Sequence, residues 1–273
     1  MNTAEHEALQ KETRLIALLK EYGTVAVAYS GGVDSTYLGA LAHKTLASQA
    51  HFYIADTPLI PRQELEEALN FAHQQQWQIE VFHFDALEDQ RFLRNDELRC
   101  YYCKQSLFRV LAEIGKGKGI SVLLHGENAE DRDDLTRVGM RAAEEAGILA
   151  PLAEVGFRKE EIRMRSRAHG LPTSEKAAFA CLATRLPKDT PITRDLLHTI
   201  ESTEALLRDL GCRQYRVRHH GDLCRIEVDP QDMALLIQPD HRLRILRHFR
   251  QLGYQHITLD LAGYESSGKK ILG

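Results

Sequence analysis

The chain has 273 residues, 43% of them hydrophobic, enough for one large domain or two modest ones with a buried core. Its 35 basic and 39 acidic residues give a net charge of −4, which argues against a general nucleic-acid-binding protein. No apolar run is long enough to cross a membrane, and residues 1–23 have the pattern of a charged amphipathic helix rather than an export signal. Because five unevenly spaced cysteines accompany these features, we predict a cytoplasmic protein whose thiols act as ligands or reagents.

Strand and helix patterns alternate through the first two thirds of the chain. The predicted strands cover residues 24–29, 51–56, 77–84 and 121–126, and the predicted helices between and after them cover 34–47, 61–76, 101–115 and 158–169. This alternation predicts an α/β fold with a doubly wound parallel sheet, in which ligands bind beyond the carboxyl ends of the strands. Residues 126–139 read as a polar loop at one of these ends.

The pattern changes at residues 186–193, where two prolines interrupt it. After this point we expect a smaller α+β arrangement. Its predicted elements are a helix over 194–210, a hairpin over 213–228, helices within 230–252 and a strand over 255–260. We therefore predict two domains, 1–186 and 187–273.

The first predicted strand leads into a glycine-rich turn, VAVAYSGGVDS, at residues 25–35. Gly31 and Gly32 allow close approach of a ligand to the backbone, and the helix that begins near Asp34 directs unpaired N–H groups toward an anion. Ser30 and Ser35 add hydroxyl donors, and Asp34 is suited to hold Mg²⁺. The lysine and glycine spacing of a Walker A loop are absent. A simple tight connection is the weaker interpretation.

This stretch resembles the S-G-G-x-D-S signature of the PP-loop ATP pyrophosphatases. The resemblance implies that ATP is split between its α and β phosphates, that the loop holds the leaving pyrophosphate, and that AMP is transferred to the substrate. It also implies a set of nucleotide contacts, at Ser30, Gly31, Gly32, Val33, Ser35, Asp56 and Gly126. Asp34 is the implied catalytic residue and Mg²⁺ ligand.

The cysteines bear on the second half of such a reaction. Cys100 and Cys103 form a C-x-x-C pair in RCYYCK, which alone is equally typical of zinc, an iron–sulfur cluster, a redox pair or chance. Cys181 is either a small buried side chain or a reactive thiolate, favoured by Lys176 and Arg185 on either side. The two cysteines of the second domain, Cys212 and Cys224, fit core positions of strands.

Five motifs follow one another in the order found in the LarE family of sulfur transferases, which the chain resembles over nearly its whole length. They are RCYYCK, RVGMRAAEEAGILAPL, ACLATRLPKDTPIT, RVRHHGDLCRIEV and GYESSGK. The resemblance implies ATP-dependent adenylation of a carboxylate of pyridinium-3,5-biscarboxylic acid mononucleotide, in the synthesis of a nickel-pincer cofactor. Cys181 matches the cysteine that displaces AMP and yields its sulfur, leaving a thiocarboxylate on the substrate and dehydroalanine on the enzyme.

A subset of this family has three cysteines that bind a [4Fe-4S] cluster, and Cys100, Cys103 and Cys181 match that subset. In this case a sulfide bound at the one open iron of the cluster supplies the sulfur, and the enzyme is reused. The family resemblance further implies a homo-oligomer, a hexamer, with a small mononucleotide substrate.

The sequence departs from the family pattern near the expected substrate. Residues 174–177 are Ser-Glu-Lys-Ala where the family has Trp-Asp-Lys-Pro, and Glu127 replaces a threonine after the fourth strand. Val138 replaces a proline, and Thr184 replaces the serine before Arg185. These differences affect the expected substrate more than the expected chemistry.

Charged residues complete the predicted site. Arg216 and Arg218 alternate on one face of the predicted hairpin and, with Arg225, either bind a phosphate or carboxylate or form a solvated face; the family motif favours phosphate. Arg185 and Lys104 are predicted to act in catalysis, Lys104 on the substrate or AMP.

Four acidic residues receive a weaker assignment. Asp131 and Asp134 either join Asp34 at Mg²⁺ or lie in a solvated loop, and Glu204 and Glu227 resemble acidic residues of the family's second domain.

Three other functions compete with sulfur transfer to a small molecule. A tRNA thiolase shares the loop and the three cysteines, but the acidic net charge and the lack of an added RNA-binding domain argue against it. An ammonia-using amide synthetase leaves the cysteines unexplained. A nucleotide-binding module without catalysis does not account for the intact loop.

Overall fold

The computed structural model describes residues 3–134, 138–177 and 180–264. The chain divides into two compact units: unit 1 comprises residues 1–92 and 97–176, and unit 2 comprises residues 93–96 and 177–273. The predicted domain boundary between residues 186 and 187 stays a prediction. None of the helices in the described part of the chain is long and apolar enough to cross a membrane.

Unit 1 is built on a four-stranded parallel sheet in the order β3-β2-β1-β4. The strands are β1 (Val25–Ala28), β2 (Ala50–Asp56), β3 (Gln78–His83) and β4 (Val122–His125). Because the chain runs outward from β1 to β3 and then returns to place β4 on the other side of β1, the order reverses between β1 and β4. In open α/β sheets such a reversal is where ligands bind.

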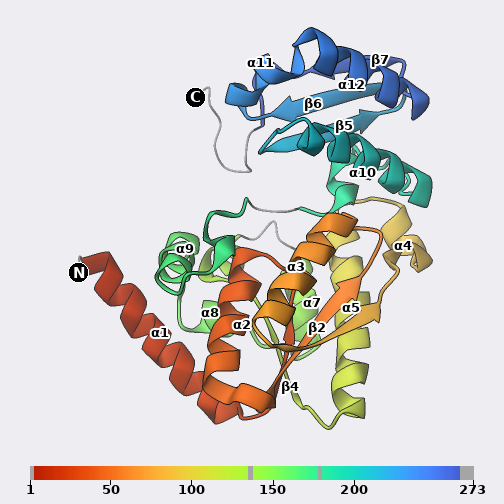
Figure 1. The fold of residues 1–273 in the computed structure, drawn as a ribbon. Coiled ribbons are helices and arrows are strands. Elements are labelled where there is room, and N and C mark those ends of the chain that lie inside the picture. Colours follow the sequence, from red (N-terminus) through yellow and green to blue (C-terminus); the bar gives the residue numbers. More distant parts are fainter. Residues whose placement is uncertain (1–2, 135–137, 178–179, 265–273) are drawn as a thin grey trace. The chain divides into compact units, whose positions relative to one another are not determined.

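Helices cover both faces of this sheet (Figure 1), which confirms the predicted fold class. The helices up to residue 168 are α1 (Thr3–Tyr22), α2 (Val33–Leu46), α3 (Arg62–Gln74), α4 (Gln90–Leu93), α5 (Arg99–Gly117), α6 (Ala129–Asp133), α7 (Gly139–Glu145), α8 (Pro151–Glu154) and α9 (Lys159–Ala168). Short 3₁₀ turns in unit 1 are η1 (Ala47–Gln49), η2 (Ala86–Glu88) and η3 (Pro172–Glu175).

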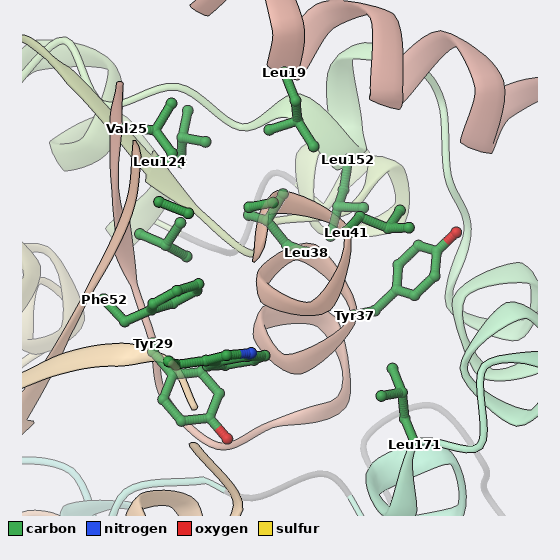
Figure 2. Packing of buried hydrophobic residues seen from close by; sticks show 14 of the residues in the cluster. Leu19, Val25, Tyr29, Tyr37, Leu38, Leu41, Phe52, Leu124, Leu152 and Leu171 are labelled. Atoms are coloured by element: carbon green, nitrogen blue, oxygen red, sulfur yellow. The ribbon is translucent and has the colours of Figure 1, made fainter. Parts of the chain in front are cut away.

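Alternation along the strands separates the two cores. Val25, Val27 and Phe52 pack with α1, α2, α3 and α9, whereas Ala26 and Tyr53 pack with α5 and α7. Figure 2 shows leucines of α2 and α1 meeting Leu124 and Leu152 in the first core. The sheet is thus buried on both faces, as a parallel sheet requires.

The predicted polar loop over residues 126–139 is wrong in one respect, because it contains α6 and the start of α7. Asn128 accepts hydrogen bonds from the N–H groups of Glu130 and Asp131, and the Asp131 carboxylate accepts one from the Asn128 N–H. This capping box gives a short polar segment the means to form a helix.

Unit 2 contains a three-stranded sheet in the order β5-β6-β7, backed by helices. Its elements are η4 (Leu182–Arg185), α10 (Arg194–Asp209), β5 (Tyr215–His220), β6 (Leu223–Val228), η5 (Pro230–Asp232), α11 (Met233–Leu236), α12 (Pro239–Gln251) and β7 (His256–Leu259). β5 and β6 form the predicted antiparallel hairpin, and β7 lies parallel to β6. Cys212 and Cys224 are buried in this core, as predicted.

A short segment from the first half of the chain belongs to unit 2. Asn95 is fully buried, and its side-chain amide donates to the carbonyls of Pro187 (2.7 Å) and Thr190 (2.9 Å). Main-chain bonds from Asp189 to Asn95 and from Ile192 to Leu93 add to this pairing. The chain therefore passes between the units at both ends of residues 93–96 as well as after residue 176.

Candidate active site

The glycine-rich loop lies at the reversal of strand order, between β1 and α2. A β-carbon on Gly31, whose φ is +71°, would be 2.6 Å from the β-carbon of Ala68 on α3, so only glycine fits there. Across the reversal, a β-carbon on Gly126 would be 2.7 Å from the Ser35 nitrogen. Both predicted glycines therefore allow backbone to approach the loop from neighbouring elements.

Hydroxyl groups and helix geometry shape the loop interior. The Ser30 and Ser35 hydroxyls lie 3.0 Å apart, and the Ser35 hydroxyl also accepts from the Ser30 N–H and donates to the Gly32 carbonyl. Gly32 caps α2 without a side chain, so no capping side chain occupies the first N–H groups of this helix. Those donors and the helix dipole make the loop suited to phosphate.

Asp34 stands in the first turn of α2 and is largely buried. One oxygen, Oδ2, accepts from Lys159 Nζ at 2.6 Å and from Asn128 Nδ2 at 3.4 Å. The other, Oδ1, is buried and has no hydrogen-bond partner among the described residues. Burial raises the pKa of Asp34, Lys159 opposes this, and the charge of Asp131 adds to it. An unpartnered carboxylate oxygen beside a phosphate loop fits a Mg²⁺ ligand.

The other acidic residues predicted near Mg²⁺ lie around α6. Asp131 is engaged in the capping box, and Asp134 follows the last residue of α6. Sequence reasoning missed Lys159, the first residue of α9. A basic helix was predicted there, but nothing in the local pattern indicates that its first lysine contacts a residue 125 positions earlier.

Asp56 and Lys104 are two further predicted site residues of unit 1, one at the end of β2 and the other in α5. Asp56 ends β2 and forms an ion pair with Arg62 of α3; both side chains remain substantially exposed. The Lys104 side chain, on α5, lies close to the first residue of α7: a β-carbon on Gly139 would be 2.8 Å from Lys104 Cδ. Asp56 is thus accessible to a ligand, and Lys104 is fixed between α5 and α7.

A buried pair of an acid and an imidazole lies at the end of β4. His125 Nε2 lies 3.2 Å from Glu127 Oε2, and both side chains are about nine-tenths buried. Burial, with the charges of Lys104 and Arg132, lowers the pKa of His125 to about 3, so the imidazole is neutral. Burial raises the pKa of Glu127, against the same two cations. Glu127, at the position where the family pattern has threonine, is thus a buried carboxyl group beside a neutral imidazole.

The three candidate cluster ligands come from both units. Cys100 and Cys103 occupy the first turn of α5 in unit 1, three residues apart and hence on one side of the helix, with Cys100 exposed. Cys181 precedes η4 in unit 2 and is partly exposed. Within either unit, the described histidine, cysteine, aspartate and glutamate side chains form no group of three able to hold a metal. The three-cysteine ligand set stays a prediction.

Arg185 holds the loop that carries Cys181. Its guanidinium, only 1% exposed, forms two parallel bonds to Glu204 of α10, at 2.9 and 2.8 Å. The same group donates to the carbonyl of Cys181 at 3.0 Å. Glu204 in turn accepts from the N–H of Val217 on β5. Arg185 thus contacts the main chain of Cys181. The other cation predicted to flank this cysteine is Lys176, and it pairs with Glu64 in unit 1.

The predicted arginines do gather on one face of the β5–β6 hairpin. Arg218 and Arg225 lie opposite each other and both bond to Glu227, each at 2.9 Å. Arg218 also donates to the carbonyl of Thr184, three residues after Cys181. Arg216 is 92% buried, which lowers its pKa together with the charges of Arg185 and Arg218. The arginine face is therefore hydrogen-bonded to the cysteine loop.

A Gly-Gly turn at the reversal of a parallel sheet, with an acidic first helical turn, defines a PP-loop nucleotide-binding enzyme. No protein-family model matches the chain. It is 31% identical over 258 residues, covering 94% of this chain and 92% of the relative, to pyridinium-3,5-bisthiocarboxylic acid mononucleotide synthase of Lactiplantibacillus plantarum. The chain belongs to this family, the LarE family of ATP-dependent sulfur transferases.

The chain is also similar to two further proteins. An uncharacterized protein of Synechocystis is 34% identical over 261 residues, which cover 93% of this chain and 96% of the relative. One of the subunits of the glutamine-hydrolysing GMP synthase of Methanocella arvoryzae is 24% identical over 209 residues, covering 71% of this chain and 67% of the relative. The second similarity fits the wider PP-loop superfamily.

Proposed function

We propose that this enzyme adenylates a carboxylate of pyridinium-3,5-biscarboxylic acid mononucleotide and replaces an oxygen of that carboxylate by sulfur. The product is a thiocarboxylate, in keeping with the name of the Lactiplantibacillus relative. The observation that carries the proposal is the bond from Arg218 to the Thr184 carbonyl, which ties the arginine face to the Cys181 loop. Within unit 2, a group that binds a substrate phosphate is thereby held next to the proposed sulfur donor.

The first half-reaction uses unit 1. The loop from Ser30 to Ser35 binds the phosphates of ATP through backbone N–H groups and hydroxyls, and Asp34 holds Mg²⁺, which neutralises phosphate charge. The substrate carboxylate attacks the α-phosphorus, the bond to the β-phosphate oxygen breaks, and pyrophosphate leaves. Asp56 and Gly126 line the nucleotide, and Lys104 lies near the AMP or substrate.

The second half-reaction uses unit 2. The Cys181 thiolate adds to the activated carbonyl and AMP departs with its oxygen, leaving a thioester. Loss of the Cys181 α-proton and cleavage of its Cβ–S bond then release the thiocarboxylate and leave dehydroalanine. Arg185, which bonds to the Cys181 carbonyl and to Glu204, acts as a positioning residue for this step. The arginine face binds the substrate phosphate.

A [4Fe-4S] cluster on Cys100, Cys103 and Cys181 is the proposed alternative source of sulfur. These three thiolates would hold the cluster, which would supply sulfur from bound sulfide, so the protein's own cysteine sulfur would be preserved. Cys100 and Cys103, on one side of α5, support this ligand set. As in the family pattern, we also propose a homo-oligomer; the molar mass in solution tests this.

Two measurements test the proposed function. With the mononucleotide substrate and Mg–ATP, the products should be AMP and pyrophosphate; ADP and phosphate would contradict it. After one turnover, mass spectrometry should find the Cys181 peptide lighter by the mass of hydrogen sulfide if this cysteine is consumed. If the cluster supplies the sulfur, anaerobic protein holds about four irons per chain, the peptide keeps its mass and Cys100→Ala stops sulfur transfer.

A further inference from the structure

The chain leaves unit 1 at Lys176, and side chains of two helices hold this residue in place. The Lys176 ammonium lies 2.7 Å from Glu64 Oε2 and 3.4 Å from Glu67 Oε2, both on α3. Arg163 of α9 donates to the main-chain carbonyl of Lys176 at 2.9 Å and to that of Ser174. We call Arg163, Lys176 and Glu64 the exit clamp. It fixes both the side chain and the main chain of the last residue of unit 1.

Through Glu64, the exit clamp is connected to the phosphate loop. α3 packs against Gly31, where a β-carbon would be 2.6 Å from the Ala68 β-carbon and 3.9 Å from the Glu64 carbonyl oxygen. The Lys176 and Glu64 side chains are 20% and 30% exposed, so solvent screens their attraction less than that of a fully exposed pair. The helix that pairs with the end of unit 1 is therefore the helix that contacts the glycine-rich loop.

The main chain at the clamp has a conformation that the local sequence does not impose. Lys176 has a φ of −62° and a ψ of 130°, which is the conformation that a proline in the next position favours. The family pattern has a proline at that position, whereas this chain has Ala177, which leaves the backbone of Lys176 less restricted. The bonds made by Arg163 and Glu64 therefore restrict this residue where a proline ring does not.

The clamp limits the length of chain that leads to the sulfur. Cys181 follows Lys176 by five residues, and an extended chain spans at most ~3.4 Å per residue, or roughly 17 Å here. If the chain were held only as far as the buried Leu171, ten residues would double this reach. The volume open to the thiol would then grow about eightfold, and its effective concentration at a bound substrate would fall in proportion.

We propose that the exit clamp positions Cys181 for attack on the adenylated substrate, which makes Lys176 a positioning residue for sulfur transfer. This inference rests on the proposed function. With the clamp closed, the thiolate adds to the activated carbonyl carbon before water does. With the clamp broken, water adds to that carbon instead, AMP leaves, and the carboxylate re-forms as the added water loses its protons. ATP is then consumed without a thiocarboxylate being made.

The test measures the ratio of thiocarboxylate to AMP that the enzyme forms from the mononucleotide substrate and Mg–ATP in a single turnover. Lys176→Met should lower this ratio roughly three- to tenfold, the range set by the change in effective concentration, while pyrophosphate release continues. Lys176→Arg keeps the charge and the pair and should keep the ratio. Because loss of folded protein lowers both products together, a purely structural role of Lys176 would leave the ratio unchanged.

A charge exchange separates the clamp from a direct effect of the lysine on the thiol. Lys176→Glu combined with Glu64→Lys restores an ion pair of reversed sign, so it should recover most of the ratio that Lys176→Glu alone loses. If the cation acted on the Cys181 thiolate itself, the double variant would stay as low as the single one. That result would overturn the proposal.

Lys11→Met is the matched control. Lys11 lies 2.6 Å from Glu161 of α9 in a pair of similar burial, but this pair joins α1 to α9, away from the end of unit 1. The variant should leave the ratio unchanged. A wild-type ratio in Lys176→Met would overturn the proposal and leave the proposed function intact. Failure of the wild-type enzyme to form any thiocarboxylate would overturn the proposed function instead.

Discussion

The two proposed anion-binding regions of the molecule consist of different chemical groups. In unit 1 the site consists mainly of main-chain groups, namely two glycines and the uncapped N–H groups of α2, together with two serine hydroxyls. In unit 2 long side chains make it, because Arg218 and Arg225 reach one carboxylate, Glu227. A main-chain site is encoded in consecutive residues, whereas a side-chain site depends on contacts between separate elements.

In both regions a side chain of opposite charge pairs with a residue of the proposed binding site. Lys159 is paired with Asp34, and Glu227 neutralises part of the arginine face. Such pairs lower the cost of burying like charges together before the ligand binds. The difference is that the pair in unit 1 contains one lysine, while unit 2 keeps Arg216 buried beside two other guanidinium groups. We therefore expect substitutions to act on ATP and on the second substrate independently.

Cys181→Ala gives the largest expected effect and tests this independence directly. It should abolish thiocarboxylate formation, because no sulfur is available to displace AMP, while pyrophosphate release from ATP continues. Product analysis by mass spectrometry and a pyrophosphate assay measure the two halves. Formation of the thiocarboxylate at the wild-type rate would show that the sulfur passes through another group.

Arg185→Met should weaken unit 2 more than any other single change at this site. It leaves Glu204, 4% exposed, without its guanidinium partner, and removal of one member of a buried pair costs about 3–5 kcal/mol. Chemical unfolding measures the loss, and Mg–ATP binding should survive. Arg208→Ala, at the exposed pair with Asp209, is the control and should cost no more than about 1 kcal/mol. Equal losses in both variants would contradict this role of Arg185.

Glu12→Gln tests the framework of unit 1. Burial favours a higher pKa for Glu12, but hydrogen bonds from Arg165, Tyr37 and His169 outweigh it and lower the pKa from 4.5 to about 2. The stability from this depressed pKa is therefore present above pH 4.5 and lost as the pH falls toward 2.

At neutral pH the substitution should cost on the order of 2 kcal/mol, since hydrogen bonds to a charged group are lost. Unfolding free energies of both proteins across the acid range should converge as the wild type becomes protonated. A difference between the two proteins that does not change with pH would mean that the Glu12 charge contributes nothing.

Tyr264→Leu should have the smallest effect and refines the account of the arginine face. The Arg216 guanidinium lies 4.9 Å from the centre of the Tyr264 ring, and a contact of this kind is worth about 0.5–1 kcal/mol. Affinity for the mononucleotide should fall roughly two- to fivefold, by the same estimate. Tyr264→Phe keeps the ring and should bind as the wild type does. An equal loss in both variants would assign the effect to the hydroxyl instead.

The sequence predicted the fold class and the family because both depend on local patterns. Alternation of strands and helices gave the doubly wound sheet, and the Ser30–Ser35 loop lies at the predicted strand end. Sequence reasoning did not predict α6, because a capping box can stabilise a helix in a polar segment that has the pattern of a loop. It also placed Arg216 and Arg218 correctly on one face, because strand alternation is a local rule.

The contacts that sequence reasoning missed connect distant parts of the chain. Lys159 and Asp34 are 125 residues apart, and nothing near either residue indicates the other. Arg185 was expected to act on the Cys181 thiol, but its contacts are to Glu204 and to main-chain carbonyls. A charged residue in a motif shows that a charge is needed there, and only the folded chain shows which partner uses it. Parts of the quoted motifs, at residues 137 and 265–269, lie outside the described residues.

The segment at residues 93–96 has a consequence for biosynthesis. Asn95 leaves the ribosome well before its acceptors, Pro187 and Thr190, which follow 92 and 95 residues later. Nascent chains fold from the N-terminus. While the sheet of unit 1 forms around β1, residues 93–96 therefore cannot yet form their hydrogen bonds to unit 2. A fragment that stops at residue 176 therefore exposes the Asn95 amide to water. A fragment that starts at residue 177 lacks residues 93–96, which belong to unit 2. A single cut in the chain therefore cannot separate complete copies of the two units.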